Sequence, residues 1–259
     1  MRRASLRGSW HALALMLVSS IAFASAASAA APTAVTLHLA GDSTMAEKRS
    51  EKRPETGWGE RLAERFRPDT VQVRNLAMNG RSTRTFIAEG RWQALLDRVV
   101  AGDYVLIQFG HNDQSRDKPD RYTPPADYVR NLARFVAEVR ARAATPVLLT
   151  PVSRRRFDPQ GRLQDSHGDY PGLVRALAAR EHVPLIDLER RSQALLQEAG
   201  VDGSRRWFLQ LAAGAHPNYP NGVEDNTHFS PLGAARIADE FAWALRASGL
   251  PLAALLRED

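Results

Sequence analysis

The stretch that decides the fold reads VTLHLAGDSTM and covers residues 35–45. Apolar and polar residues alternate up to Ala40 and are followed by Gly-Asp-Ser, so the sequence predicts a β-strand that ends in a tight turn. Such a turn is ordinary between a strand and a helix, where Ser43 serves only as a helix cap. It also presents a serine hydroxyl at the edge of a sheet. The remaining sequence has to decide between these two interpretations.

Four more segments have the composition of strands. They are short and almost continuously apolar, which is typical of a parallel sheet whose two faces are both covered. Longer segments with apolar residues three and four positions apart separate them, as in amphipathic helices. This alternation predicts an α/β fold with a doubly wound parallel sheet and right-handed crossovers. The expected strands are 35–41, 71–77, 104–110, 146–152 and 183–188, and the expected helices lie within 57–66, 91–100, 125–143, 169–181 and 230–249.

The N-terminal segment has the character of an export signal. Three arginines, a short apolar run and a small-residue stretch follow one another, and residues 27–29 fit the A-x-A cleavage pattern. The apolar run is shorter than the roughly 20 residues that a membrane span needs. The sequence therefore predicts a signal peptide at 1–29, a single domain at 30–259, and an exported protein, periplasmic or extracellular. A retained N-terminal anchor and twin-arginine export through Arg2 and Arg3 are the alternatives.

Charge and cysteine content exclude several classes of function. The formal net charge is +6, and the leader's three arginines supply half of it, so the mature part carries about +3. That value is no signature of nucleic-acid binding. The chain has no cysteine, which excludes disulfides, thiol chemistry and cysteine-ligated metals. It contains neither H-E-x-x-H nor a close histidine pair, so we expect no metal and no cofactor.

Polar motifs follow the first three predicted strands. Gly-Asp-Ser lies at 41–43, Asn-Gly-Arg-Ser at 79–82 and Gly-His-Asn-Asp at 110–113. In open parallel sheets, ligands bind outside the carboxyl ends of the strands. We therefore expect these three loops to share one edge of the sheet and to form the site.

A serine becomes a nucleophile only beside a base that an acid orients. Asp225 and His228 lie three residues apart, directly before a capped helix. In a loop, this spacing lets the carboxylate contact one ring nitrogen while the other nitrogen faces Ser43. Acyl transfer also needs donors for the developing oxyanion. The backbone N–H groups of Ser43 and Gly80 and the side-chain amide of Asn112 are the candidates.

The motifs GDSTM, NGRS, GHNDQ and DNTH resemble, in order and position, those of the SGNH, or GDSL-like, hydrolases. The set is most similar to the rhamnogalacturonan acetylesterase branch. This resemblance implies a flavodoxin-like three-layer sandwich with a five-stranded parallel sheet, the SGNH hydrolase fold, and a metal-independent serine esterase. Ser43 matches the family's nucleophile, His228 its base and Asp225 the orienting acid. Gly80 and Asn112 match its oxyanion donors.

Three further residues are candidates for substrate binding. Arg81 and Arg84 lie just after Gly80, the candidate oxyanion glycine, and basic side chains there suit an acidic polysaccharide. The arginines at 154–156 follow the fourth predicted strand and are expected at the same edge. Tyr219 lies in a loop rich in proline and glycine and offers a face on which a sugar can stack. The alternatives are a solvated charged face and a surface aromatic residue. Asp42 is expected to order its loop by binding backbone N–H groups, not to titrate as a second acid.

The sequence therefore predicts an exported serine esterase, a carbohydrate esterase that removes acetyl groups from rhamnogalacturonan or pectin through an acetyl-enzyme. Its partner is an acetylated polysaccharide or oligosaccharide; no nucleic acid and no stable membrane insertion are expected. The oligomeric state stays open. One alternative is an SGNH esterase acting on xylan, peptidoglycan acetyl groups or lipid. The other is a carbohydrate-binding protein without catalytic activity.

Overall fold

The computed structural model describes Met1 and residues 34–258. Apart from Met1, the expected signal peptide lies outside the described residues, and its cleavage site stays a prediction. From residue 34 onward the chain builds one sheet of five parallel strands in the order β2-β1-β3-β4-β5. This is the flavodoxin-like strand order, so the predicted fold class is confirmed. The strands are β1 (Val35–Gly41), β2 (Val71–Asn75), β3 (Tyr104–Gln108), β4 (Thr145–Leu149) and β5 (Leu185–Ile186).

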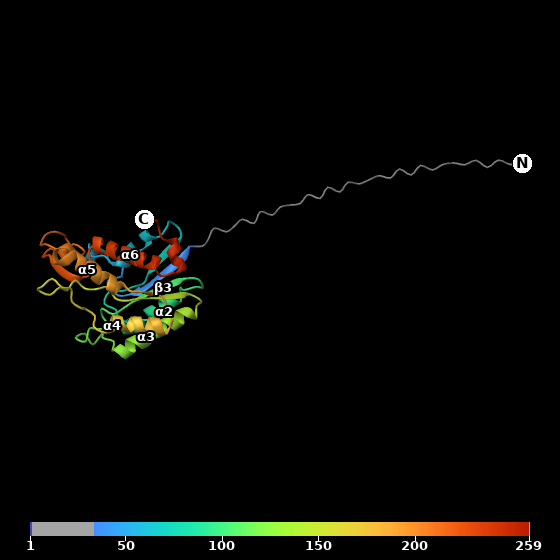
Figure 1. Cartoon of the computed structure of the whole chain (residues 1–259), viewed down its shortest axis with the longest axis horizontal. Coiled ribbons are helices and arrows are strands. Elements are labelled where there is room, and N and C mark those ends of the chain that lie inside the picture. Colours follow the sequence, from blue (N-terminus) through green and yellow to red (C-terminus); the bar gives the residue numbers. More distant parts are fainter. Residues whose placement is uncertain (2–33, 259) are drawn as a thin grey trace. The chain divides into compact units, whose positions relative to one another are not determined.

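Helices cover both faces of the sheet, as Figure 1 shows for α3 and α4 on one side and α5 and α6 on the other. The first layer holds α1 (Thr83–Ala88), α2 (Arg91–Leu96), α3 (Pro125–Arg140) and α4 (Tyr170–Arg180). The second holds α5 (Leu188–Arg205) and α6 (Pro231–Arg246). The fold is therefore a three-layer sandwich.

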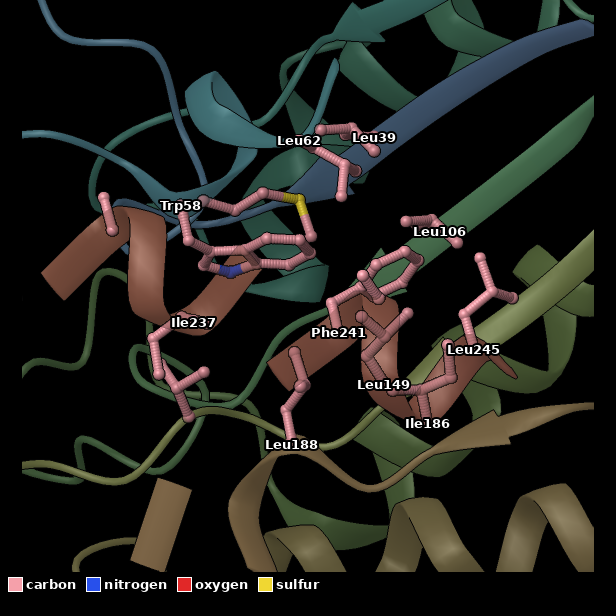
Figure 2. Packing of buried hydrophobic residues seen from close by; sticks show 14 of the residues in the cluster. Leu39, Trp58, Leu62, Leu106, Leu149, Ile186, Leu188, Ile237, Phe241 and Leu245 are labelled. Atoms are coloured by element: carbon pink, nitrogen blue, oxygen red, sulfur yellow. The ribbon is translucent and has the colours of Figure 1, made fainter. Parts of the chain in front are cut away.

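Alternate side chains of the strands feed two separate cores. Leu37, Leu39 and Leu106 face the layer with α6, whereas Val105 and Ile107 face the layer with α3. Figure 2 shows the first core, in which Trp58 and Phe241 lie over the sheet leucines. Their rings stack with centroids 5.7 Å apart. This two-sided burial explains why the central strands are almost continuously apolar.

The expected helix at 57–66 is wrong in type. The segment instead forms two 3₁₀ turns, Trp58–Arg61 and Ala63–Arg65. Gly57 and Gly59 pack directly against the backbone that follows β1, where an added Cβ would lie 2.1 and 2.6 Å from carbonyl oxygens. The backbone N–H of Trp58 donates to the carbonyl of Thr44 at 2.9 Å. The segment therefore follows the turn that carries Ser43, and that contact replaces a regular helix.

A two-stranded antiparallel sheet, β6 (Phe208–Leu211) with β7 (Val223–Phe229), is a second departure from the sequence-based expectation. Asp225 and His228 lie within β7 and not in a loop. The hairpin precedes α6, whose N-terminus is capped by the Ser230 hydroxyl as predicted. Residue 228 is thus brought to the edge of the main sheet by a separate small sheet. Among the described residues, no helix is long and apolar enough to cross a membrane.

Candidate active site

The three loops at the carboxyl ends of β1, β2 and β3 meet at one edge of the sheet. There they line a pocket of about 450 Å³. Ser43, Gly80 and Asn112 line it from the three loops, and His228 lines it from β7. Four of the residues singled out in the sequence therefore lie around one cavity, and Asp225 contacts the ring of the fourth.

Ser43, His228 and Asp225 form a continuous hydrogen-bonded chain. The Ser43 Oγ lies 2.8 Å from the Nε2 of His228, and the Nδ1 of His228 lies 2.6 Å from the Oδ2 of Asp225. An ionised carboxylate only accepts, so Nδ1 carries the proton and Nε2 accepts from the serine hydroxyl. This is the tautomer that a general base needs.

The Asp225 carboxylate is held in its ionised form. Burial opposes ionisation, but the hydrogen bond and the charge of the His228 ring favour it. The backbone N–H groups of Thr227 and His228 also donate to Oδ1, at 2.7 and 2.9 Å. Together these contacts hold the pKa of Asp225 below its usual value. The carboxylate can therefore stabilise a positive charge on the adjacent ring.

Ser43 does not cap a helix; it lies in a turn whose shape Asp42 fixes. The Asp42 Oδ1 accepts hydrogen bonds from the backbone N–H and the hydroxyl of Thr44, at 3.0 and 2.8 Å. This confirms that Asp42 orders the loop. Burial raises the pKa of Asp42, while the Thr44 hydrogen bonds and the charges of His228 and Arg154 lower it.

Gly80 and Asn112, the candidate oxyanion donors, line the same pocket as Ser43. Gly80 has φ +76, a conformation that favours glycine. The Asn112 Nδ2 donates to the carbonyl of Arg81 at 3.0 Å, which fixes the orientation of the amide. An amide has two N–H donors, so this contact leaves one for a ligand.

A comparison with known proteins places this arrangement in a family. Residues 39–236 match the model of the GDSL-like lipase/acylhydrolase family. The chain belongs to this family. It is 42% identical over 218 residues to the rhamnogalacturonan acetylesterase RhgT of Bacillus subtilis, spanning 84% of this chain and 92% of RhgT. It is 29% identical over 258 residues to the rhamnogalacturonan acetylesterase of Emericella nidulans, spanning 91% of this chain and 94% of that protein.

Two solved structures share the family's architecture. The crystal structure of YxiM from Bacillus subtilis superposes with a TM-score of 0.72 and 26% identity, covering 85% of this chain and 58% of YxiM. The acetylxylan esterase Axe2 of Geobacillus stearothermophilus gives 0.60 at 19% identity, covering 88% of this chain and 99% of Axe2. The likeness to Axe2 is one of fold alone. The resemblance inferred from the sequence motifs is thus confirmed.

The substrate-binding candidates of this GDSL-like chain do not line the pocket. Arg81 donates to the carboxylate of Glu89 at 3.0 and 3.1 Å, and Arg84 donates to the carbonyl of Pro119 at 2.6 Å. The Tyr219 hydroxyl donates to the carbonyl of Lys52 at 2.9 Å. All three hold loops in place, and none of them is among the residues around the cavity.

Basic side chains other than those of Arg81 and Arg84 lie around the cavity. Lys52, Lys118, Arg121 and Arg154 line the cavity. The Arg121 Nη1 lies 3.4 Å from the Oδ1 of Asn112. The sequence gave no signal for Lys52, Lys118 and Arg121, because charged residues in loops are usually just solvated. Of the arginine run at 154–156, only Arg154 reaches the cavity, where it donates to the carbonyl of Ser166 at 2.8 Å.

A buried histidine pair supports one wall of this GDSL-like site. The His111 Nδ1 lies 3.1 Å from the Nε2 of His167, and burial lowers the pKa of both rings well below the usual value. Both imidazoles are therefore neutral at neutral pH. Asp113 accepts from the backbone N–H and the hydroxyl of Thr83, at 2.9 and 2.6 Å, and so ties the loop after β3 to α1. Across residues 34–258, no group of three or more acidic or histidine side chains is arranged to hold a metal ion.

Proposed function

We propose that this chain is a serine esterase that removes O-acetyl groups from an acidic plant cell-wall polysaccharide, and that rhamnogalacturonan is its preferred substrate. The observation that carries the proposal is the unbroken chain from Ser43 through His228 to Asp225, with contacts of 2.8 and 2.6 Å, whose first two members line a pocket. A serine hydroxyl, an imidazole and an ionised carboxylate in this order generate a nucleophile at neutral pH. The names of the relatives from Bacillus subtilis and Emericella nidulans, both rhamnogalacturonan acetylesterases, support the same reaction.

In the first half of the reaction, the Ser43 Oγ attacks the acetyl carbonyl carbon while the Nε2 of His228 takes the hydroxyl proton. Asp225 stays ionised and stabilises the imidazolium. The N–H groups of Ser43, Gly80 and Asn112 bind the oxygen that becomes negative. When the tetrahedral intermediate collapses, the bond to the sugar oxygen breaks. His228 returns its proton to that oxygen, and the sugar leaves with a free hydroxyl group.

In the second half, water replaces the serine hydroxyl. His228 removes a proton from the water, whose oxygen attacks the acetyl-serine carbonyl. The same donors bind the second oxyanion. The intermediate releases acetate as the proton passes from His228 to the Ser43 oxygen, which restores the enzyme.

The charge of the cavity supports an anionic substrate. Lys52, Lys118, Arg121 and Arg154 line it, whereas Glu55 is the one carboxylate among the described lining residues. Glu55 is paired with a buried lysine at 2.8 Å, so its charge is compensated. A cleft lined by one sign of charge concentrates ligands of the opposite sign. A backbone that carries uronic acid carboxylates fits this cavity better than a neutral xylan.

Acetate release from defined polymers tests the proposal. We expect purified enzyme to release acetate fastest from acetylated rhamnogalacturonan, more slowly from acetylated homogalacturonan, and most slowly from acetylxylan. The Ser43→Ala variant is expected to release none above background, while Ser50→Ala, a change at an exposed serine, retains full activity. Faster release from xylan would overturn the substrate assignment. Unchanged release by Ser43→Ala would overturn the mechanism.

Export is part of the same proposal, because plant polysaccharides lie outside the cell. Export is tested by expressing the full chain, with its N-terminal segment intact, in a bacterial host. We expect the mature protein to be recovered from the periplasm or the medium, with Edman sequencing starting close to residue 30. Recovery of the full-length chain from the cytoplasm would contradict export.

A further inference from the structure

Lys48 places an ammonium group in the interior between the two loops that carry the proposed backbone oxyanion donors. Its side chain has no solvent exposure. The Nζ donates to the carbonyl oxygen of Ser43 and to the Oδ1 of Asn79 at 2.9 Å, and lies 2.8 Å from the Oε1 of Glu55. An ammonium has three N–H donors, so each of them meets one acceptor.

Such a group is costly to bury without paired and hydrogen-bonded partners. Three acceptors from three separate segments have to be held together for this one lysine. A methionine or leucine would fill the same space at lower cost if packing were its only role. The arrangement therefore indicates that Lys48 serves the geometry of its acceptors.

The first acceptor fixes the peptide unit directly after the proposed nucleophile. The carbonyl of Ser43 accepts from Lys48, and the N–H of the same peptide unit, on Thr44, donates to Asp42 at 3.0 Å. A peptide unit is planar, so holding both ends fixes its orientation. The Ser43 N–H belongs to the preceding peptide unit, whose carbonyl, on Asp42, accepts from the N–H of Ala46 at 3.0 Å. Because the peptide units on both sides of Ser43 are held, its backbone is fixed, and with it the direction of the Ser43 N–H.

The second acceptor fixes the loop after β2. Asn79 directly precedes Gly80, whose φ is +76. Glycine adopts positive and negative φ about equally readily, so its own backbone does not hold this conformation. The side-chain carbonyl of Asn79 accepts from Lys48, and its backbone carbonyl accepts from the Arg81 side chain at 2.8 Å. Lys48 thus connects the segment that carries the Gly80 N–H to the turn that carries the Ser43 N–H.

We propose that Lys48 is a positioning residue that locks the two backbone oxyanion donors in one geometry, with Glu55 as its counter-ion. The inference rests on the proposed function. It assigns Lys48 to the transition state and not to substrate binding, so its loss lowers kcat and leaves KM nearly unchanged. Misplacing such groups by about 1 Å costs about 100-fold in rate.

The absence of cysteine from the sequence allows an atom-level test. Lys48→Cys introduces a unique thiol, which is alkylated in denaturant before the protein is refolded. Bromoethylamine gives a side chain of lysine's length with an ammonium, and iodopropane gives the same length with a methyl group in its place. Wild-type protein treated with either reagent serves as the refolding control, and circular dichroism gives the folded fraction.

We expect the ammonium form to recover kcat to within about tenfold of wild type and the propyl form to stay about 100-fold lower, with similar KM. Equal kcat for the two forms would overturn the proposal, as would a loss confined to KM. A structural role alone would change the melting temperature without separating the two forms in kcat per folded molecule.

A second variant covers the case in which the alkylated forms do not refold. Lys48→Met combined with Glu55→Gln removes both charges and leaves no unpaired ion in the interior. We expect it to fold, to lose about 100-fold in kcat, and to exchange amide hydrogens faster in the segment around Gly80. Wild-type exchange in that segment would overturn the clamp whether or not the chain is an esterase. A wild-type protein without esterase activity, but with the expected exchange difference, would sink only the proposed function.

Discussion

The two sides of the pocket are built differently. Asp42, Ser43 and Thr44, on the side of the main sheet, are buried, with 0, 9 and 1% exposure. Asp225 and His228, on the hairpin, keep 26 and 27% of their side chains exposed. Ser43 is therefore held by the core, whereas His228 is held by short-range contacts within β7. Changes on the serine side should lower stability as well as activity, and changes on the hairpin should lower activity at little cost in stability.

The largest effect is expected from Asp225→Asn. An asparagine keeps the shape but favours the wrong tautomer of His228, because its amide can donate to Nδ1. We expect kcat to fall by about 10⁴-fold while the melting temperature changes by only a few degrees. Hydrolysis of p-nitrophenyl acetate and thermal unfolding measure the two quantities. Asp97→Asn, at an exposed site, is the matched control, and a comparable loss there would remove the interpretation.

The buried carboxylates near the serine should make stability depend on pH. Burial raises the pKa of Asp113 to about 7, from a usual value of 3.8. Between these values the folded chain keeps a proton that the unfolded chain has lost, so the free energy of unfolding falls as the pH rises. Asp113→Asn lacks this titration. The free energy of unfolding of Asp113→Asn, relative to that of wild type, should therefore rise between pH 4 and pH 7, by at most about 4 kcal/mol.

Urea unfolding at pH 4, 5, 6 and 7 measures this difference. Asp42 is present in both proteins and burial raises its pKa in each, so the difference between the two curves reports mainly on Asp113. If the free energy of unfolding changes with pH in parallel for wild type and Asp113→Asn, the pKa of Asp113 is not raised in the folded chain. The contrast with the hairpin, where the pKa of Asp225 is lowered, would then lose its physical basis.

Truncation of one carboxylate on each side compares the two regions directly. Asp42→Ala leaves the N–H and the hydroxyl of Thr44 buried without an acceptor, which should cost about 2 kcal/mol in free energy of unfolding. Asp225→Ala also frees two backbone N–H groups, but they lie on the partly exposed β7 and can bind water. We expect a cost of less than about 1 kcal/mol there. Equal costs, measured at pH 7, would contradict the difference between the two sides.

The smallest effect is expected from charge at the rim. Lys118 lines the cavity and is exposed, so its attraction for an acidic polymer is screened by solvent. Lys118→Gln should raise KM for acetylated rhamnogalacturonan about threefold at low ionic strength. The effect should vanish in 1 M salt. Arg98→Gln is the charge-matched control, and an equal effect of that change would mean that only net charge matters.

The sequence predicts the serine side well and the hairpin side less well. The strand-end loops follow from nearly continuous apolar runs that are interrupted by Gly-Asp-Ser and Gly-His-Asn-Asp, so Ser43 and Asn112 could be placed at one edge. The sequence does not indicate the hairpin, because β7, VEDNTHF, is mostly polar and its partner strand β6 is short. The three-residue spacing of Asp225 and His228 nevertheless predicts the contact between the carboxylate and the ring that the structure shows.

The sequence indicates the positions of long charged side chains least well. Lys48 occurs in a run of polar residues that is typical of a surface loop, and nothing local indicates that its ammonium is buried. Only the approach of Asn79 and Glu55, from other segments, reveals its role. Arg81 was expected in the pocket because it follows Gly80, but its side chain turns to Glu89. Long side chains reach partners that sequence position does not specify.

Covalent labelling tests the central claim most directly, namely that His228 and Asp225 activate Ser43. Wild type, Ser43→Ala and His228→Ala are incubated with a fluorophosphonate, and peptides are mapped by mass spectrometry. We expect one adduct on Ser43 in wild type, none in Ser43→Ala, and labelling slowed by orders of magnitude in His228→Ala. An adduct at another serine, or equal labelling of wild type and His228→Ala, would contradict the account.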